Sequence, residues 1–90
     1  MRRTAVITGQ FRKDVARMKR RGKELKKLRG AMEALLSGSV LAPRLRDHLL
    51  KGDWGGRREC HLEPDWLLIY LPRQAEVIFE RTGSHSDLFE

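Results

Sequence analysis

Hydrophobic and polar residues alternate through residues 59–63, and an apolar run follows at residues 66–71, with Pro64 and Asp65 between them. Alternation with a period of two predicts β-strands, and Pro64 followed by Asp65 suits the two central positions of a type I turn. The segment is therefore predicted to form a β-hairpin. Counting outward from the turn pairs Glu63 with Trp66, His61 with Leu68, and Glu59 with Tyr70.

The two faces of this hairpin differ in chemistry, because side chains that lie opposite each other share a face of the sheet. The apolar face, which we expect to pack in the core, carries Cys60, Leu62, Leu67, Ile69 and Leu71. The other face carries Arg57, Glu59, His61, Glu63, Trp66, Leu68 and Tyr70. This second face combines acidic, basic, imidazole and aromatic groups, so it is a candidate functional surface.

Two helices are predicted before the hairpin, after a short β-prone run at residues 3–8. The apolar residues of the first helix recur at helical spacing and are Phe11, Val15 and Met18. This helix should end near Gly22, since glycine readily adopts the left-handed conformation that closes helices. A second helix is predicted for residues 23–36, where leucine and methionine recur at three- and four-residue steps. The Ser-Gly-Ser sequence at residues 37–39 should end it.

The remaining segments complete a predicted α+β domain. Residues 40–54 lack a clear period and should be irregular, and Gly55 and Gly56 let the chain turn into the hairpin. Residues 75–81 form another β-prone run. The resulting order, β-α-α-β-β-β, predicts one α+β domain over residues 1–90, with the helices covering one face of an antiparallel sheet.

Lysine and arginine outnumber aspartate and glutamate by 19 to 12 in the 90 residues, giving a formal net charge of +7. Such a surface favours polyanions, which include nucleic acid, an acidic protein or an anionic membrane. No apolar run approaches the length of a membrane span, and we expect neither a signal peptide nor a membrane partner. The single cysteine, Cys60, suits a reducing cytoplasm and is predicted to be a packed thiol.

Many of the cations lie on the two predicted helices, including Lys23, Lys26 and Lys27 at the start of the second. They form either a solvated helix face or a surface that tracks phosphates without reading sequence. Both interpretations stay open here, because no zinc-finger or RNP-type aromatic motif accompanies these charges.

The three histidines, His48, His61 and His85, lie outside the predicted helices and close in sequence to acidic residues. Imidazole paired with carboxylate is suited to proton transfer near neutral pH, and Lys or Arg can offset charge on a phosphate. These groups are sufficient for RNA cleavage by the RNA's own 2′-hydroxyl. His48 or His85 could instead cap a backbone group in a turn. A zinc site is less favoured, because neither HExxH nor paired CxxC spacing occurs.

Three segments resemble those of a known toxin family. They are RDHLLKGDW at residues 46–54, RECHLEPDWLLIY at residues 58–70 and RTGSHSDLF at residues 81–89. In the order and spacing of these segments, the chain is similar to the YafQ branch of the RelE/ParE-type bacterial toxins. These are the endoribonuclease halves of toxin–antitoxin pairs. The helical half resembles that branch in length and basic character.

The resemblance implies a cytoplasmic type II toxin that cuts mRNA in the ribosomal A site by histidine acid–base catalysis, without metal or another cofactor. The implied catalytic residues are His48, His61, Asp65, His85 and Phe89. We expect either His48 or His61 to be the base and His85 to protonate the leaving group, with Asp65 orienting a histidine. The expected RNA and phosphate ligands are Arg58, Arg81, Lys23, Lys26 and Lys27.

The resemblance also implies partners, namely a cognate acidic antitoxin, the ribosome and mRNA, with operator DNA bound only through the antitoxin complex. Glu59 stands where family members often have aspartate, so it is left outside the catalytic set.

The alternative function is a non-catalytic basic module, or an inactive toxin relative, that binds an antitoxin, DNA or a protein target. A binding module has no need of three histidines in the matched positions, which favours the nuclease.

Overall fold

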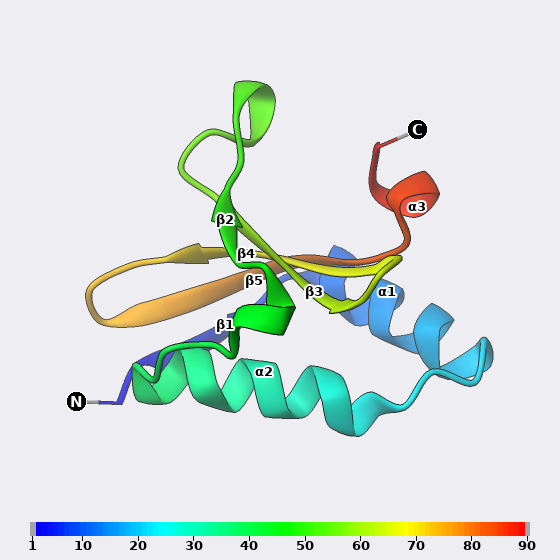
Figure 1. The fold of residues 1–90 in the computed structure, drawn as a ribbon, viewed down its shortest axis with the longest axis horizontal. Helices are drawn as coiled ribbons and strands as arrows, with labels where there is room; N and C mark the ends of the chain where they lie inside the picture. The colour runs from blue at the N-terminus through cyan, green and yellow to red at the C-terminus, as the bar shows by residue number, and fades with distance from the viewer. Residues whose placement is uncertain (1, 90) are drawn as a thin grey trace.

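Among residues 2–89, which the computed structural model describes, five strands form one mixed sheet, and two helices cover one of its faces (Figure 1). The strands are β1 (Thr4–Ile7), β2 (His48–Leu49), β3 (Arg58–Glu63), β4 (Trp66–Pro72) and β5 (Glu76–Gly83). Their spatial order is β1-β5-β4-β3-β2, with β1 parallel to β5 and the other neighbours antiparallel. The predicted α+β fold is confirmed, although the parallel β1–β5 pair makes the sheet mixed.

The two covering helices begin and end close to the predicted residues. They are α1 (Gly9–Arg20) and α2 (Leu25–Ser37). Thr8 starts α1, because its hydroxyl accepts a hydrogen bond from the backbone N–H of Phe11 at 3.0 Å. Gly22 follows α1 with φ +82°, and Gly38 closes α2 with φ +78°, so both predicted glycine stops are confirmed.

The segment expected to be irregular contains short regular elements. These are the 3₁₀ turns η1 (Pro43–Leu45) and η2 (Gly52–Trp54), with the two-residue strand β2 between them. A further short helix, α3 (His85–Phe89), lies in the predicted C-terminal turn. Short elements of this kind give little periodic signal, because each spans too few residues for its hydrophobic period to repeat. Together they place two of the three histidines.

The hairpin around Pro64 and Asp65 forms as predicted, but its register differs. Glu63 lies opposite Trp66 as predicted, whereas His61 lies opposite Leu67 instead of Leu68, and Glu59 lies opposite Ile69 instead of Tyr70. The pairing shifts between His61 and Glu63, where a bulge adds one residue to β3. Because side chains alternate with a period of two, a shift by one residue exchanges the faces of β4 relative to β3.

Both faces of the hairpin are therefore buried, each by a different part of the chain. The larger core, under α1 and α2, contains Cys60, Leu62, Trp66, Leu68 and Tyr70 together with apolar residues of both helices. The predicted partition of β4 is wrong: Trp66, Leu68 and Tyr70 are core residues. A smaller cluster joins Leu67, Ile69 and Leu88, with Leu50 and Trp54 packed against it.

Cys60 is buried in the larger core, which confirms the predicted packed thiol. Burial raises its pKa to about 12, with the charges of Asp47 and Glu59 adding to the effect. The thiol is thus protonated near neutral pH and is not a nucleophile. Among residues 2–89, no helix has the length and apolar character needed to cross a membrane.

Candidate active site

Five aromatic and imidazole rings form a row on the side of the sheet that carries α3. In order they are His48 of β2, His61 of β3, His85 and Phe89 of α3, and Trp54 of η2. The centroids of successive rings lie 6.0, 6.0, 6.3 and 6.1 Å apart. The fold therefore brings together histidines that are far apart in the sequence, and Phe89 lies at the same site.

Glu59 lies between the first two histidines of this row. One of its carboxylate oxygens, Oε2, is 2.9 Å from Nε2 of His48 and 3.2 Å from Nε2 of His61. The Glu59 side chain is only 6% exposed, so its carboxylate has little contact with water. Because a carboxylate only accepts hydrogen bonds, each ring donates its Nε2–H. Nδ1 of a neutral His61 ring is then left to accept a proton, whereas Nδ1 of His48 lies 3.4 Å from the carbonyl oxygen of Leu49.

Sequence reasoning left Glu59 outside the catalytic set because its side chain is longer than that of aspartate. In the structure this length lets the carboxylate reach across from β3 to β2, where His48 pairs with Glu59. The two-residue spacing of Glu59 and His61 along one strand was the signal that could have joined them, since such residues share a face. Glu59 is thus a functional candidate that the sequence hypothesis missed.

Asp65 holds His85 in a defined orientation. Its Oδ1 accepts hydrogen bonds from both the backbone N–H of His85, at 2.8 Å, and the ring Nδ1, at 2.7 Å. These bonds, with the backbone bond first, lower the pKa of Asp65 below its ordinary value, so the carboxylate is charged at neutral pH. Nδ1 of His85 is the donor, and Nε2 is left for a substrate. The orienting role of Asp65 in catalysis stays a prediction, which this contact supports.

The start of α3 is held by a reciprocal capping arrangement. The backbone N–H of Ser84 donates to Asp87 Oδ2 at 2.8 Å, and the N–H of Asp87 donates to Ser84 Oγ at 3.1 Å. Arg21, which follows α1, donates two hydrogen bonds to the same carboxylate, at 2.7 and 3.0 Å. The Arg21 bonds are the main cause that holds the pKa of Asp87 well below its usual range. This network fixes the helix that carries His85 and Phe89.

The two arginines expected to hold phosphate are each bound to a carboxylate. Arg58 Nε donates to Asp47 at 3.1 Å, and the hydroxyl of Tyr70 donates to the other oxygen of Asp47 at 2.5 Å. Burial is the main cause that raises the pKa of Tyr70, and the bond to Asp47 adds to it. Asp47 therefore fixes Arg58 beside β2, and this guanidinium is only partly available to a ligand.

Arg81 binds Asp14 of α1, a residue that the sequence analysis did not single out. Arg81 Nε lies 2.7 Å from Asp14 Oδ2, and Arg17 Nη2 lies 2.9 Å from Asp14 Oδ1. The backbone N–H of Thr82 and the amide of Gln10 also donate to this carboxylate, at 3.1 and 3.0 Å. Asp14 is fully buried, so these four donors offset the cost of burying its charge.

The lysines at the start of α2 differ in their contacts. Lys23 and Lys27 both bind Glu63, at 2.7 and 3.0 Å, and lower the pKa of that carboxyl, with Lys23 having the larger effect. The Lys26 side chain forms no ion pair within residues 2–89 and is exposed. Of these three expected phosphate ligands, only Lys26 is therefore a free cation within the described part of the chain.

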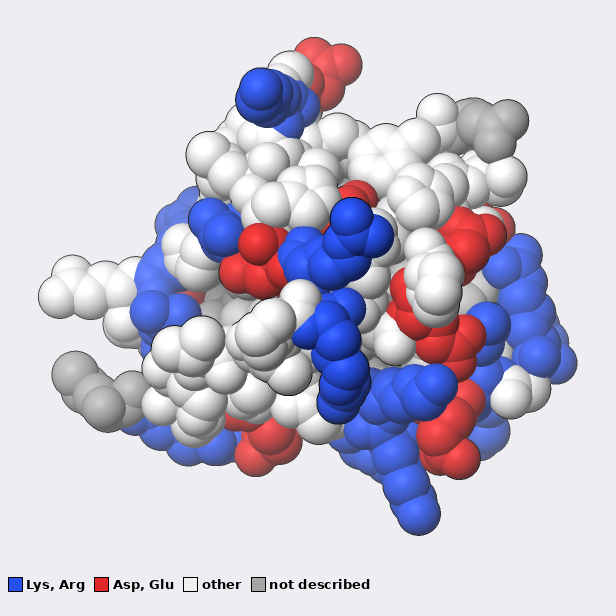
Figure 2. All heavy atoms as spheres, viewed as in Figure 1, with Lys and Arg blue, Asp and Glu red and all other residues white. Residues whose placement is uncertain are grey.

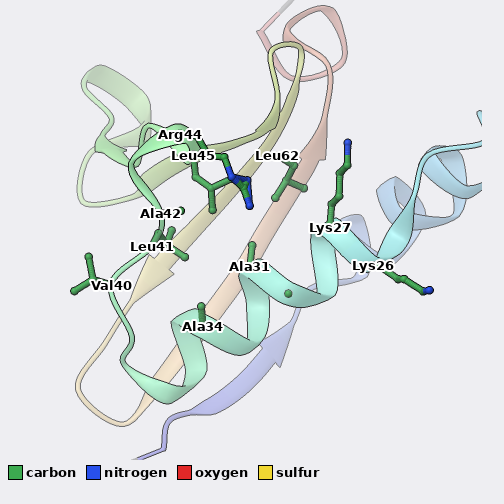
Figure 3. A pocket seen from close by; sticks show the side chains of 11 residues that line it. Lys26, Lys27, Ala31, Ala34, Val40, Leu41, Ala42, Arg44, Leu45 and Leu62 are labelled. Atoms are coloured by element: carbon green, nitrogen blue, oxygen red, sulfur yellow. The ribbon is translucent and has the colours of Figure 1, made fainter.

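A groove of about 460 Å³ lies next to these lysines, between α2 and residues 40–45 (Figure 3). Its floor contains the small residues Gly30, Ala31 and Ala34. Arg44, Leu45 and Leu62 also line it. Arg44 also lines a second, adjoining pocket that includes His61.

A metal ion has one plausible set of ligands among the described residues. His48, Glu59 and His61 each offer one ligand atom, and these atoms all lie within 4.8 Å of one another. Two imidazoles and a carboxylate suit zinc or copper. The sequence contains no close metal-binding motif, and the cluster arises only because β2 and β3 pair. The same atoms that would bind a metal already bind one another in the structure.

Comparisons with known proteins match this chain over its whole length. The mRNA interferase toxin YafQ of Escherichia coli K12 is 40% identical over 90 residues, which cover 99% of this chain and 98% of that protein. A YafQ chain in the crystal structure of the E. coli DinJ–YafQ toxin–antitoxin complex superposes with a TM-score of 0.93 at 40% identity, with full coverage of both chains. A metal-bound toxin from Helicobacter pylori superposes with a TM-score of 0.90 at 38% identity, covering 99% of this chain and 100% of that one.

A family model covers nearly the whole chain as well. It is described as a bacterial toxin of type II toxin–antitoxin systems, YafQ, and it matches residues 3–90. The match includes the helices as well as the three histidine segments, and so extends beyond the motifs from which the resemblance was first inferred. The chain belongs to the YafQ family of type II toxin–antitoxin toxins.

Proposed function

We propose that this chain, acting as one domain of residues 1–90, is a cytoplasmic mRNA endoribonuclease toxin. It cuts messages in the ribosomal A site and is held inactive by a cognate antitoxin. The observation that carries this proposal is the row of His48, His61 and His85, in which the rings lie 6.0 Å apart and each binds a carboxylate. A protein that only binds nucleic acid has no need of this proton-transfer set.

Cleavage uses the 2′-hydroxyl of the RNA as the nucleophile. His61 takes the proton of that hydroxyl at Nδ1 while Glu59 stabilises the charge that forms on the ring. The 2′-oxygen bonds to phosphorus, the bond from phosphorus to the 5′-oxygen breaks, and His85 gives its Nε2 proton to that oxygen. The products are a 2′,3′-cyclic phosphate and a free 5′-hydroxyl. His48 shares Glu59 with His61 and so helps to orient it.

Two further groups assist at the His85 end of this row. Asp65 keeps His85 oriented through its bonds to the ring Nδ1 and to the backbone N–H. Phe89 is 43% exposed although it is large and apolar, and its ring lies beside those of His85 and Trp54. An exposed ring in this position can stack on a base next to the cleaved bond.

The reaction needs no metal, which leads to a prediction about chelation. Dialysis against EDTA should leave the cleavage rate unchanged, and the pH dependence should be bell-shaped, because one histidine must be neutral and another protonated. The measurement is the initial cleavage rate before and after dialysis, with zinc or copper added back to a third sample. Loss of activity that an added metal restores would assign His48, Glu59 and His61 to a catalytic metal instead.

Cleavage is expected to depend on the ribosome, because this small chain has few groups with which to align a flexible RNA. Phosphate contacts position RNA without specifying its sequence, and alignment for attack can lower a barrier by several kcal/mol. We expect fast cleavage at one codon on stalled ribosomes and slow, unfocused cleavage of the same message alone. A time course on one message with and without ribosomes measures this. Equal rates at identical cut sites would show a free ribonuclease.

The antitoxin partner is an acidic protein that covers the basic surface. The formal net charge of +7 favours such a partner, and the relative from E. coli was crystallised with the antitoxin DinJ. A partly disordered acidic segment can fold over a surface of this size and block access of RNA. Operator DNA is then bound through the antitoxin and not by this chain alone.

A further inference from the structure

A pocket of about 270 Å³ lies directly beside the proposed base, His61. Its wall on the sheet side contains His61, Glu63 and Pro64 of the hairpin, and the opposite wall contains Arg44 and Arg46 from the segment around η1. Lys and Arg side chains gather near the middle of this face, in front of the segment that joins α2 to β3 (Figure 2). The pocket thus combines charged side chains with the apolar Leu45, Leu62 and Pro64, and it reaches the row of histidines at His61.

Arg44 and Arg46 are cations that the fold leaves free. Both are exposed, and neither forms an ion pair within residues 2–89. The two arginines that sequence analysis assigned to phosphate, Arg58 and Arg81, are bound to Asp47 and Asp14 instead. A phosphate that approaches His61 through this pocket would therefore meet two guanidinium groups whose hydrogen-bond donors are not engaged.

Glu63 is the one acidic group that lines this pocket. It could repel a phosphate, but Lys23 and Lys27 bind its two oxygens at 2.7 and 3.0 Å. The two lysines more than offset its charge. The net charge around the pocket is therefore positive, which favours an anionic ligand.

The backbone at Arg46 supports a positioned role for its side chain. Arg46 has φ +51°, and it is the one non-glycine residue with positive φ in the part of the chain that the structure describes. This left-handed conformation is unfavourable for arginine and favours glycine. The conformation is imposed from both sides: Arg46 closes η1, and the next residue, Asp47, binds Arg58 and Tyr70. An arginine side chain is thus held at the pocket despite the backbone cost.

We propose that Arg44 and Arg46 form a phosphate-binding subsite for the message, holding the phosphate next to the one that is cut. Guanidinium groups bind phosphate oxygens through charge-assisted, often bidentate hydrogen bonds. The subsite fixes the RNA backbone beside His61, while Phe89 lies next to His85. This inference rests on the proposed nuclease function and adds the groups that position its substrate.

The test uses three variants that separate charge from backbone strain. Arg46→Gly removes the cation while relieving the positive φ, so its fold should be at least as stable as that of the wild type. Arg46→Lys keeps a cation in the same backbone. Arg73→Gly is the matched control, because Arg73 is exposed in the turn between β4 and β5 and forms no ion pair among the described residues.

The first measurement is binding of a short RNA with 2′-O-methyl groups, which cannot be cleaved. We expect Arg46→Gly to raise the Kd about tenfold, the scale of a lost hydrogen bond to a charged group, and to weaken its salt dependence. Arg46→Lys should restore most of the affinity, and Arg73→Gly should bind like the wild type. Equal losses of RNA affinity in Arg46→Gly and Arg73→Gly would show that only the net charge of the protein matters. That result would overturn the subsite.

The second measurement is cleavage kinetics on naked message and on stalled ribosomes. If Arg46 binds the message, Arg46→Gly should have a higher KM than the wild type on both substrates, with kcat nearly unchanged. A defect confined to the ribosomal reaction would mean that Arg46 contacts ribosomal RNA, which overturns the assignment to the message. If the wild type binds the RNA through Arg46 but cuts neither substrate, the nuclease proposal fails while the subsite stands.

Discussion

Replacing His85 or His61 with alanine is expected to lower the rate of message cleavage by about 10²-fold or more, the usual scale for loss of a general acid or base. His85 is expected to protonate the leaving 5′-oxygen, and its ring is held by Asp65 at 2.7 Å. His61 lies between the other two histidine rings, with both centroids 6.0 Å away, so it can reach the 2′-hydroxyl when His85 reaches the leaving group.

The measurement is the cleavage rate on stalled ribosomes, with thermal melting of each variant as the control for folding. The His85 side chain is 53% exposed and should tolerate the change with little loss of stability. The His61 side chain is 17% exposed and contacts Glu59, so a modest fall in Tm is expected. A folded variant that cuts at the rate of the wild type would remove that histidine from the mechanism.

Replacing Asp14 with alanine is expected to lower the free energy of unfolding by about 3–5 kcal/mol, the scale for breaking a buried ion pair. Asp14 is fully buried and binds Arg81, Arg17 and the backbone N–H of Thr82. The alanine variant leaves Arg81 and Arg17 with positive charges that have lost their partner, and leaves the Thr82 N–H without its acceptor. Because Arg81 precedes Thr82 on β5, the end of that strand and the start of α3 should also loosen.

Urea denaturation of the wild type and the variant measures this change. Asp53→Ala provides the control, because Asp53 is an exposed carboxylate in η2 with no ion pair among residues 2–89. Its effect should stay within about 0.5 kcal/mol, as for most surface substitutions. A loss of about 1 kcal/mol or less in Asp14→Ala would show that Arg81 and Arg17 find other partners, and that the network does not hold α1 to the sheet.

The bond between Asp14 and Arg81 also shows where sequence reasoning reached its limit. The two residues are 67 positions apart, and nothing local to either one predicts that they meet. Asp14 lies within the first predicted helix, and nothing in the helical pattern marked it as buried. Its burial depends on how α1 packs on β5, which is a property of the tertiary structure. Arg81 was therefore predicted to hold phosphate, although the fold binds it to a carboxylate.

The hairpin register failed for a different reason. The turn at Pro64 and Asp65 was predicted correctly, because turn preferences depend on the residues within the turn itself. The bulge between His61 and Glu63 has no such local signal, yet it moves Trp66, Leu68 and Tyr70 into the core. Trp66 can be buried in the core because its indole Nε1–H donates a hydrogen bond to the hydroxyl of Thr82 at 2.9 Å.

The sequence by itself determined the two long helices and their glycine stops, the central turn, the α+β class, the basic character and the segments that identify the family. Each of these is carried by residues that are close together in the chain, so periodicity, turn chemistry and motif spacing are sufficient. Only the tertiary structure decided that one oxygen of Glu59 serves two histidines, and which cations stay free. These outcomes depend on strand pairing and on competition among carboxylates for the same arginines and lysines, and both are settled when distant segments pack together.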